Sequence, residues 1–439
     1  MYGNHQRDVN YEEIMKNRVV ITGLGIVSPN GVGVEAFHSA IRDGTSGIRH
    51  FPELEELNFS CQIAAKPEVS EEQKRKYFTD LQLRNFNSSG ILYGVMAGME
   101  ALEDAGIETA GKNDEPLWDL GIIFGTGTSG TAKFREAIYL LDSGKVKRLG
   151  STTVAQTMAS GISAYLGGMI GAGNQVTTNS SACATGTEAI LMGYDLIASG
   201  KARQMLCGSC SDDGPVVWGG FDAMKVLTWK HNHDPEHGSR PMSATASGFV
   251  PGSGAGALML ESLTSAQERG AKIYAEVLGG HVNNGGQRQQ GSMTAPNSSA
   301  VQRCIKTALE ASGVGGHEID YINGHLTATV KDPTEIRNWS DALDRKGADF
   351  PYINSLKGMI GHGLAASGSM ELVAAVLQLH HGFIFPNSNC EDLHPEISAI
   401  VDRNRIPIQT VSRPLNTIAK ASFGFGDVNA CVIFRQNSI

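Results

Sequence analysis

Strand-like and helix-like segments alternate along almost the whole chain, and this alternation restricts the fold more than any other feature. Apolar strand-like runs are RVVITG (18–23), LGIIFGT, QVTTNS, ALMLES (257–262), IYAEVLGG (273–280), DYING and YIN. Helical periodicity is found near 34–43, 86–106, 154–170, after Cys183, and at 298–312, 334–344 and 368–381. Strands that alternate with helices predict an α/β fold, with mixed or parallel sheets covered by helices.

The length of 439 residues predicts more than one simple core. We expect an N-terminal extension at 1–17, a first half at 18–268 and a second half at 269–439. The halves share a similar rhythm of strands and helices but contain no convincing internal sequence repeat.

Composition excludes several classes of protein. The net charge of −9 argues against a general nucleic-acid-binding surface. The sequence contains no run of about 18 uncharged apolar residues, so no membrane span is predicted. The N-terminal segment is polar and mixed in charge, without the apolar region of a signal peptide, so a cytoplasmic protein is expected.

Three weaker motifs are interpreted as structural. Cys207 and Cys210 follow an apolar strand-like run and are expected to be buried and inert, and the seven scattered cysteines predict no disulfide framework. The glycine pair after the first strand lacks the third glycine of a dinucleotide-binding fingerprint. The histidines at 231, 233 and 237 lie in a polar loop, so no metal site is expected.

Cys183 lies where a strand turns into a helix, in the segment TTNSSACATGT. Unpaired N–H groups and the helix dipole at such a position favour a thiolate. The small neighbours Ala182, Ala184 and Gly186 would admit a bulky thioester. A buried structural cysteine in a tight turn explains this segment equally well.

Three downstream segments favour a catalytic cysteine. His325 follows the strand DYING and precedes Thr327 and Thr329, whereas Lys357 and His362 precede a helix rich in small residues. The glycine–aromatic turn SFGFGDVN follows an apolar strand. One of these segments would indicate packing, but together they indicate a catalytic centre.

These motifs resemble those of the elongating β-ketoacyl-acyl-carrier-protein synthases, a family with a thiolase-like fold, over about residues 18 to 435. SSACATG resembles the nucleophile loop around Cys183, HLTAT the first-histidine motif at His325, and SLKGMIGH the motif that contains Lys357 and His362. SFGFGDVN resembles the closing loop, with Phe423 as the residue that gates the acyl channel. The resemblance implies two similar α/β halves in a layered α-β-α-β-α core.

The resemblance also implies the reaction and the role of each residue. Cys183 would carry the acyl group, and His325 and His362 would stabilise the enolate that forms when a malonyl thioester loses carbon dioxide. Lys357 would fix the histidines and their charge state. No cofactor and no metal is expected for this chemistry.

Further positions are assigned by the same resemblance. The N–H groups of Cys183 and Phe423 would form the oxyanion hole, while Thr327, Thr329 and Phe425 would bind the substrate. Asp332 and Glu335 match an acidic pair downstream of the first histidine.

Three residues depart from the family pattern. Leu326 replaces a usual glycine, which predicts a narrower or reshaped pantetheine tunnel. Ser253 replaces an acidic residue, which puts a local ion pair in doubt, and Asp427 replaces a glycine in the closing loop. These departures suggest a specialised relative.

The expected partners are an acyl carrier protein and a second subunit. Because both this chain and such carriers are acidic, a local basic patch must attract the carrier, and Lys74, Arg75, Lys76 and Arg84 are the candidates. A plain solvated helix face is an equally good interpretation of these residues. The apolar, glycine-rich region 154–190 predicts a homodimer, with a heterodimer of related subunits as an alternative.

Two other functions remain open. The first is a non-catalytic partner subunit that sets chain length, although Cys183, both histidines and Lys357 are all retained. The second is a coenzyme A-dependent acyltransferase or thiolase, although Cys431 lies in a strand-like run rather than in a reactive position. Fatty-acid elongation and a polyene or polyketide pathway are both compatible with the sequence.

Overall fold

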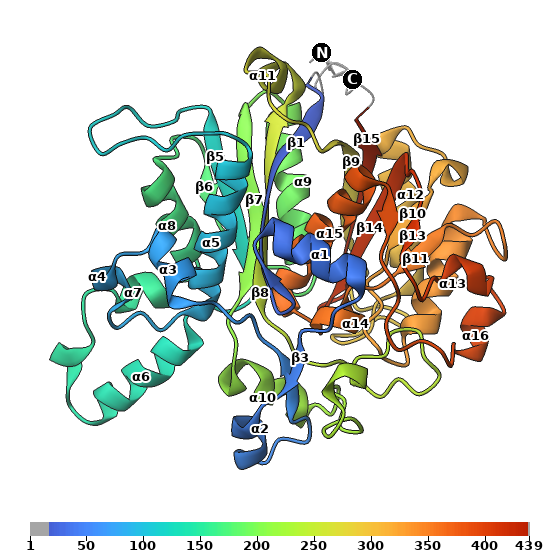
Figure 1. Cartoon of the computed structure of the whole chain (residues 1–439), viewed down its shortest axis with the longest axis horizontal. Helices are drawn as coiled ribbons and strands as arrows, with labels where there is room; N and C mark the ends of the chain where they lie inside the picture. The colour runs from blue at the N-terminus through green and yellow to red at the C-terminus, as the bar shows by residue number, and fades with distance from the viewer. Residues whose placement is uncertain (1–16, 438–439) are drawn as a thin grey trace, which may run out of the picture.

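The computed structural model describes residues 17–437. Its strands form one large mixed sheet, with helices on its outer faces and two further helices between its two halves (Figure 1). The predicted N-terminal extension at 1–17 lies outside the described residues, except for Asn17. The sheet runs in the order β11-β10-β14-β15-β9-β1-β8-β7-β5-β6. In the described part of the chain, no helix is both long and apolar enough to span a bilayer.

The sheet consists of two groups of five strands with the same topology. The first group contains β1 (Val19–Ser28), β5 (Leu120–Thr126), β6 (Val176–Thr177), β7 (Gln204–Ser211) and β8 (Gly254–Ser262). The second contains β9 (Ala275–Asn284), β10 (Tyr321–Asn323), β11 (Tyr352–Asn354), β14 (Thr417–Gly424) and β15 (Val428–Gln436). In each group the first strand pairs antiparallel with the last, the last with the fourth, and the remaining pairs are parallel.

The two groups meet only along a short stretch. Strand β1 pairs with β9 over Val19–Ile21, whereas its pairing with β8 extends along most of its length. Strand β2 (Gly31–Val32) extends β1, and two small ribbons pair β3 (Ile48–His50) with β4 (Ile63–Ala65) and β12 (Phe383–Ile384) with β13 (Val411–Ser412).

Helices complete a five-layered α-β-α-β-α arrangement, which confirms the thiolase-like fold. Helices α5 (Ser89–Asp104) and α8 (Gly161–Ile170) cover the outer face of the first group, and α12 (Ser298–Ser312) and α13 (Asp332–Leu343) lie outside the second. Helices α9 (Thr185–Ala198) and α15 (Ser367–His381) lie between the groups and contact strands of both (Figure 1). Residues 367–379 of α15 are all buried.

The two central helices touch backbone to backbone. A Cβ atom added to Gly186 would lie 2.2 Å from the backbone nitrogen of Ser369, and one added to Gly368 would lie 2.7 Å from that of Thr187. No larger residue fits at either position, because the atoms in the way are backbone. The small-residue character of both segments therefore sets how closely the two halves approach.

The predicted elements agree with the structure where hydrophobic periodicity is long. The helix predicted at 298–312 is α12, and the one at 368–381 is α15. The helix predicted at 154–170 is instead two helices, α7 (Thr153–Thr157) and α8, because the chain extends at Met158. Cys207 and Cys210 are buried in different core clusters, as expected of inert thiols.

The remaining helices are short or lie at the surface. They are α1 (Val34–Asp43), α2 (Pro52–Glu56), α3 (Glu71–Tyr77), α4 (Asp80–Leu83), α6 (Thr131–Asp142), α10 (Pro215–Ala223), α11 (Leu263–Glu268), α14 (Lys357–Ile360) and α16 (Pro395–Ser398). Helices α6 and α10 were not predicted from the sequence. Helix α6 extends away from the body of the molecule (Figure 1) and has several exposed apolar residues.

Candidate active site

Cys183 lies in a tight turn between β6 and α9. Ala182 adopts a left-handed conformation, with φ of 49°, which reverses the chain just before the cysteine. The Thr185 hydroxyl accepts a hydrogen bond from the Ser181 N–H at 2.8 Å and donates one to the Ala182 carbonyl at 2.6 Å. These bonds hold Cys183 two residues before the first residue of α9, as a half-buried residue whose sulfur faces the interior.

The thiol of Cys183 differs from the thiolate predicted from its position at a helix start. Burial raises the pKa of Cys183 to about 11, although the positive charge of Lys357 and the N–H of Phe425 act in the opposite direction. Desolvation therefore outweighs these two contributions, and the resting cysteine is a neutral thiol near neutral pH.

His325 follows β10 in a loop that is held by the predicted acidic pair. Glu335 accepts the N–H groups of His325 and Leu326, both at 2.7 Å. Asp332 accepts the N–H of Thr327 at 3.0 Å and that of Met242, from a distant loop, at 2.9 Å. Both carboxyl groups are buried, and burial raises the pKa of Asp332 to about 6 and that of Glu335 to about 7.

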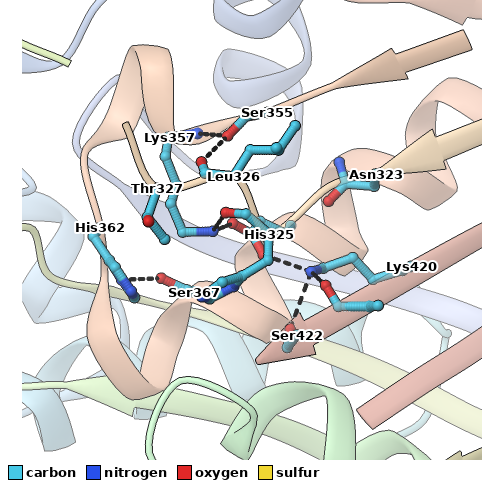
Figure 2. Close-up of polar contacts among 12 residues, drawn as sticks. Asn323, His325, Leu326, Thr327, Ser355, Lys357, His362, Ser367, Lys420 and Ser422 are labelled. Atoms are coloured by element: carbon cyan, nitrogen blue, oxygen red, sulfur yellow. Dashed lines mark hydrogen bonds and ion pairs between the residues drawn. The ribbon is translucent and has the colours of Figure 1, made fainter. Parts of the chain in front are cut away.

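His362 has a defined tautomer. The backbone N–H of Leu364 donates to Nδ1 of His362 at 3.0 Å, and the Ser367 hydroxyl lies 2.9 Å from the same nitrogen (Figure 2). Since Nδ1 accepts, the ring proton of the neutral imidazole is on Nε2. Burial and the charges of Lys357 and Lys420 lower the pKa of His362 well below 6.5, which keeps the ring neutral.

The structure brings the three predicted reactive groups together. The Cys183 sulfur and one ring nitrogen each of His325 and His362 all lie within 4.8 Å of one another. The two imidazole rings are 5.6 Å apart and nearly perpendicular. Within residues 17–437, no other three His, Cys, Asp or Glu side chains converge in this way.

Lys357 is buried beside this cluster. Its ammonium group donates to the His325 carbonyl oxygen at 2.6 Å (Figure 2). The same ammonium group forms an ion pair with Glu371 of α15. Glu371 was not predicted as a site residue, because a glutamate in an apolar helix has no distinguishing local motif. A second lysine, Lys420, contacts the same carboxylate and was also missed.

The closing loop places Phe425, rather than Phe423, against the nucleophile. The backbone N–H of Phe425 reaches the sulfur of Cys183. The Phe423 side chain is buried, with its ring 5.8 Å from that of His325. The geometry therefore places the N–H of Phe425 at the nucleophile and the ring of Phe423 beside His325.

Phe425 belongs to an aromatic series that leads to His362. Its ring lies 6.0 Å from that of Phe221, Phe221 lies 5.7 Å from Phe249, and Phe249 lies 5.0 Å from His362. Phe221 and Phe249 come from separate segments without a recognisable motif, so the sequence did not identify them. The hydroxyl groups of Thr327 and Thr329 lie 3.1 Å apart, and both residues are half-buried.

The departures from the family pattern have local explanations. The Leu326 side chain is fully buried in the core of the second half with Ile322 and Ile353. Ser253 is buried, and its hydroxyl has no hydrogen-bond partner within the described residues. Asp427 has φ of 64° and accepts the N–H groups of residues 287 and 297, at 3.0 and 2.8 Å, which ties loop 285–297 to the closing loop.

The predicted basic patch for the carrier is largely neutralised within the chain. Lys74 pairs with Glu71 at 2.7 Å, Arg75 with Asp80 at 2.8 Å, and Lys76 with Glu103 at 2.6 Å, as three exposed ion pairs. Arg84 is also exposed. The patch therefore has less net positive charge than its sequence suggests.

Comparisons with known proteins agree with this geometry. The chain matches the family model of the beta-ketoacyl synthase N-terminal domain over residues 16–266 and that of the beta-ketoacyl synthase C-terminal domain over residues 274–391. The 3-oxoacyl-[acyl-carrier-protein] synthase 1 of Escherichia coli strain K12 is 32% identical over 424 residues, which cover 95% of this chain and 99% of that protein.

Two solved structures have the same fold over nearly the whole chain. The ishigamide ketosynthase/chain length factor has a TM-score of 0.85 at 28% identity, covering 96% of this chain and all of that one. A type II polyketide synthase acyl-carrier protein in complex with its ketosynthase bound to the hexaketide has a TM-score of 0.83 at 28% identity, with the same coverage. The chain therefore belongs to the beta-ketoacyl synthase family of acyl-transferring condensing enzymes.

Proposed function

We propose that this chain is a 3-oxoacyl-carrier synthase that holds the growing acyl group on Cys183. The sulfur attacks the carbonyl of an acyl thioester, and the carrier thiol leaves with the proton that Cys183 loses. Because the resting thiol is neutral, deprotonation accompanies this attack instead of preceding it. The N–H groups of Cys183 and Phe425 stabilise the oxyanion, and one such donor contributes about 2.7–4 kcal/mol.

Decarboxylation uses the two histidines. When the malonyl thioester loses carbon dioxide, negative charge develops on the thioester oxygen, and the Nε2–H of His362 is a ready donor to it. His325 supplies the second donor from the opposite side of the cluster. The resulting carbon nucleophile attacks the acyl-cysteine carbonyl, the C–S bond breaks, and the cysteine sulfur takes up a proton as the 3-oxoacyl carrier leaves.

The observation that carries this proposal is the convergence of one thiol and two neutral imidazoles within 4.8 Å. Incubation with a panel of acyl carriers, followed by mass spectrometry of the intact protein, should detect one acyl group, located on the Cys183 peptide. Subsequent addition of malonyl carrier should release carbon dioxide and remove the adduct. An adduct on another residue, or release by water alone, would contradict the proposal.

The carrier arm is proposed to enter past Thr327 and Thr329, whose half-buried hydroxyls suit the amides of pantetheine. An acyl carrier protein is the partner in the solved ketosynthase complex at a TM-score of 0.83, which supports the same class of partner here. The Escherichia coli relative is a 3-oxoacyl-[acyl-carrier-protein] synthase, which supports the same class of carrier.

A second subunit is proposed to cover the surface formed by α6, α7 and β6. Phe134, Ile138 and Tyr139 of α6 are 52–59% exposed, and Val154 of α7 is 71% exposed. A contiguous apolar surface of this kind is typical of a subunit interface. Light scattering at micromolar concentration should give twice the chain mass. A monomer would contradict the proposal, and dimerisation only with a co-expressed relative would favour a heterodimer.

A further inference from the structure

Lys420 is a second buried lysine at the candidate site. It lies on β14, its side chain is completely buried, and its ammonium group is 2.8 Å from one carboxylate oxygen of Glu371. The same group donates to the Ser422 hydroxyl at 3.0 Å (Figure 2) and to the carbonyl of Ala421. The mechanism described above does not use this residue.

The Glu371 carboxylate is shared by two lysines. One oxygen pairs with Lys357 and the other with Lys420, so the three buried side chains have a formal net charge of +1. Without Lys420, the remaining pair would have no net charge. Lys357 also donates to the His325 carbonyl, so this group of charges is attached directly to the loop of the first histidine.

The internal symmetry of the fold offers a direct comparison for this arrangement. Thr187 of α9 hydrogen-bonds Ser422 of β14 at 2.9 Å, and Ser369 of α15 hydrogen-bonds Ser209 of β7 at 2.7 Å, as equivalent contacts in the two halves. On the helices, Ala189 lies two residues after Thr187, and Glu371 lies two residues after Ser369. On the strands, Cys207 lies two residues before Ser209, and Lys420 lies two residues before Ser422.

The first half therefore has Ala189 and Cys207 where the second half has Glu371 and Lys420. Both residues of the first pair are fully buried in one hydrophobic cluster. Burying an ion pair in place of apolar residues usually gives no gain in stability. The charges in the second half thus require another explanation, and they lie beside the two histidines.

We propose that Lys420 is a positioning residue for decarboxylation. Because it pairs with the second oxygen of Glu371, the Glu371 charge no longer cancels that of Lys357, and a net positive charge remains next to His325 and His362. This charge keeps both imidazoles neutral. This inference deepens the proposed function and rests on it. Lys420 does not touch the reacting atoms. It acts on the two rings through its own charge and through Glu371 and Lys357.

The charged groups around the rings agree with this role. Besides burial, Lys357 and Lys420 both lower the pKa of His325, and the same two lysines lower that of His362. His362 itself also lowers the pKa of His325. Glu371, from α15, faces both lysines, and Glu335, from α13, is the other carboxylate that acts on Lys420. Burial lowers the pKa of Lys420 itself, while Glu371 opposes that shift.

The test removes the charge of Lys420 with little change in shape, in the variant Lys420→Met. Removing a positive charge raises the pKa of both histidines, so the acid limb of the pH–rate profile for malonyl-carrier decarboxylation should move up by about one pH unit. Acylation of Cys183 at neutral pH should change much less than decarboxylation, because it does not depend on the neutral rings. An unshifted acid limb would overturn the proposal.

A double variant separates charge from packing. Glu371→Gln with Lys420→Met removes one negative and one positive charge, so the net charge of +1 returns on Lys357. The acid limb should then move back towards that of the unmodified protein, although two buried contacts are lost. If the double variant has the same acid limb as Lys420→Met, or a higher one, Lys420 acts only structurally.

A readout without substrate distinguishes this inference from the proposed reaction. In protein labelled with ¹³C at histidine Cε1, His325 and His362 can be assigned with alanine variants and titrated directly by NMR. Higher pKa values in Lys420→Met support the positioning role even if no acyl carrier is accepted. Unchanged values would contradict it even if condensation proceeds as proposed.

Discussion

The two halves of the molecule have the same strand order and the same pattern of parallel and antiparallel pairs, but they contribute different chemistry. In the first half, the turn that enters its central helix presents Cys183 among small, uncharged residues. In the second half, the corresponding connection into α15 presents Lys357 and His362, and His325 follows β10. A duplicated framework thus supplies a nucleophile from one half and charge stabilisation from the other.

The difference also appears in what each half buries. The inner helix of the first half has Ala189 in its apolar face, whereas α15 buries Glu371 between two lysines. Buried charge is costly unless it is paired, and pairing restricts where each group can lie. We conclude that the second half gives up part of an apolar core to control the histidines, and that the first half has no such requirement.

The largest effect is expected when the nucleophile of the first half is removed. Cys183→Ser should reduce acyl transfer by about 10³-fold or more, because a hydroxyl is hardly ionised in this setting. Decarboxylation of malonyl carrier should persist, since its donors belong to the second half. Intact mass and carbon dioxide release measure the two steps separately. Cys61→Ser is the control, because a hydroxyl can keep the hydrogen bond that its thiol donates to the Ile63 carbonyl.

The next largest effect is expected when a histidine donor of the second half is removed. His325→Ala should lower decarboxylation by about 10²–10³-fold, the usual cost of losing one oxyanion donor. The Cys183 adduct should still form. His380→Ala, at the far end of α15, is a matched control that should retain both steps. Equal losses of acylation and decarboxylation in His325→Ala would mean that the halves do not divide the reaction.

The state of the thiol can be measured without any carrier. Because the pKa of Cys183 is raised to about 11, alkylation by iodoacetamide should increase about tenfold per pH unit from about pH 7 to about pH 10. The sign follows from the thiolate being the reactive form, which is scarce below its pKa. Peptide mass spectrometry measures the rate at Cys183 alone. An alkylation rate that is already constant near neutral pH would instead support the thiolate predicted from the helix terminus.

The smallest expected effect concerns docking of the carrier on the first half. Reversing Lys74 and Lys76 to Glu should raise the KM for carrier-bound substrate by about two- to fivefold, because both lysines already have partners in the chain. Acylation by a small acyl-cysteamine thioester should change little. The effect should weaken with salt, since exposed charges are screened over about 8–10 Å.

Reversal of Arg303 and Lys306 to Glu, both on the exposed side of α12 in the second half, is the charge-matched control for docking. It should leave both substrates unaffected. Equal losses with carrier-bound and small substrates in the Lys74 and Lys76 variant would indicate a structural role for this segment.

Much of the architecture and the reactive centre could be predicted from the sequence, because long periodic segments and dense motifs determine them locally. Cys183, His325 and His362 each lie in a distinctive motif within the connection that follows a strand of the sheet. Lys420 and Glu371 could not be found this way, since each is one charge within an apolar segment and acquires meaning only through a partner far along the chain. Phe423 lies in β14 and Phe425 lies just beyond its end at Gly424, so which of the two N–H groups faces the sulfur depends on the course of the closing loop, which no local motif determines.

The backbone contact between Gly186 and Gly368 has a consequence for how the chain folds during synthesis. Helix α9 ends at Ala198, but α15, which covers its inner face, ends at His381. Roughly 180 residues must therefore be translated before that face is covered, which takes roughly 10–40 s at ordinary rates of synthesis. Throughout that interval the nascent first half presents an uncovered apolar helix, and its core is completed only when the second half arrives.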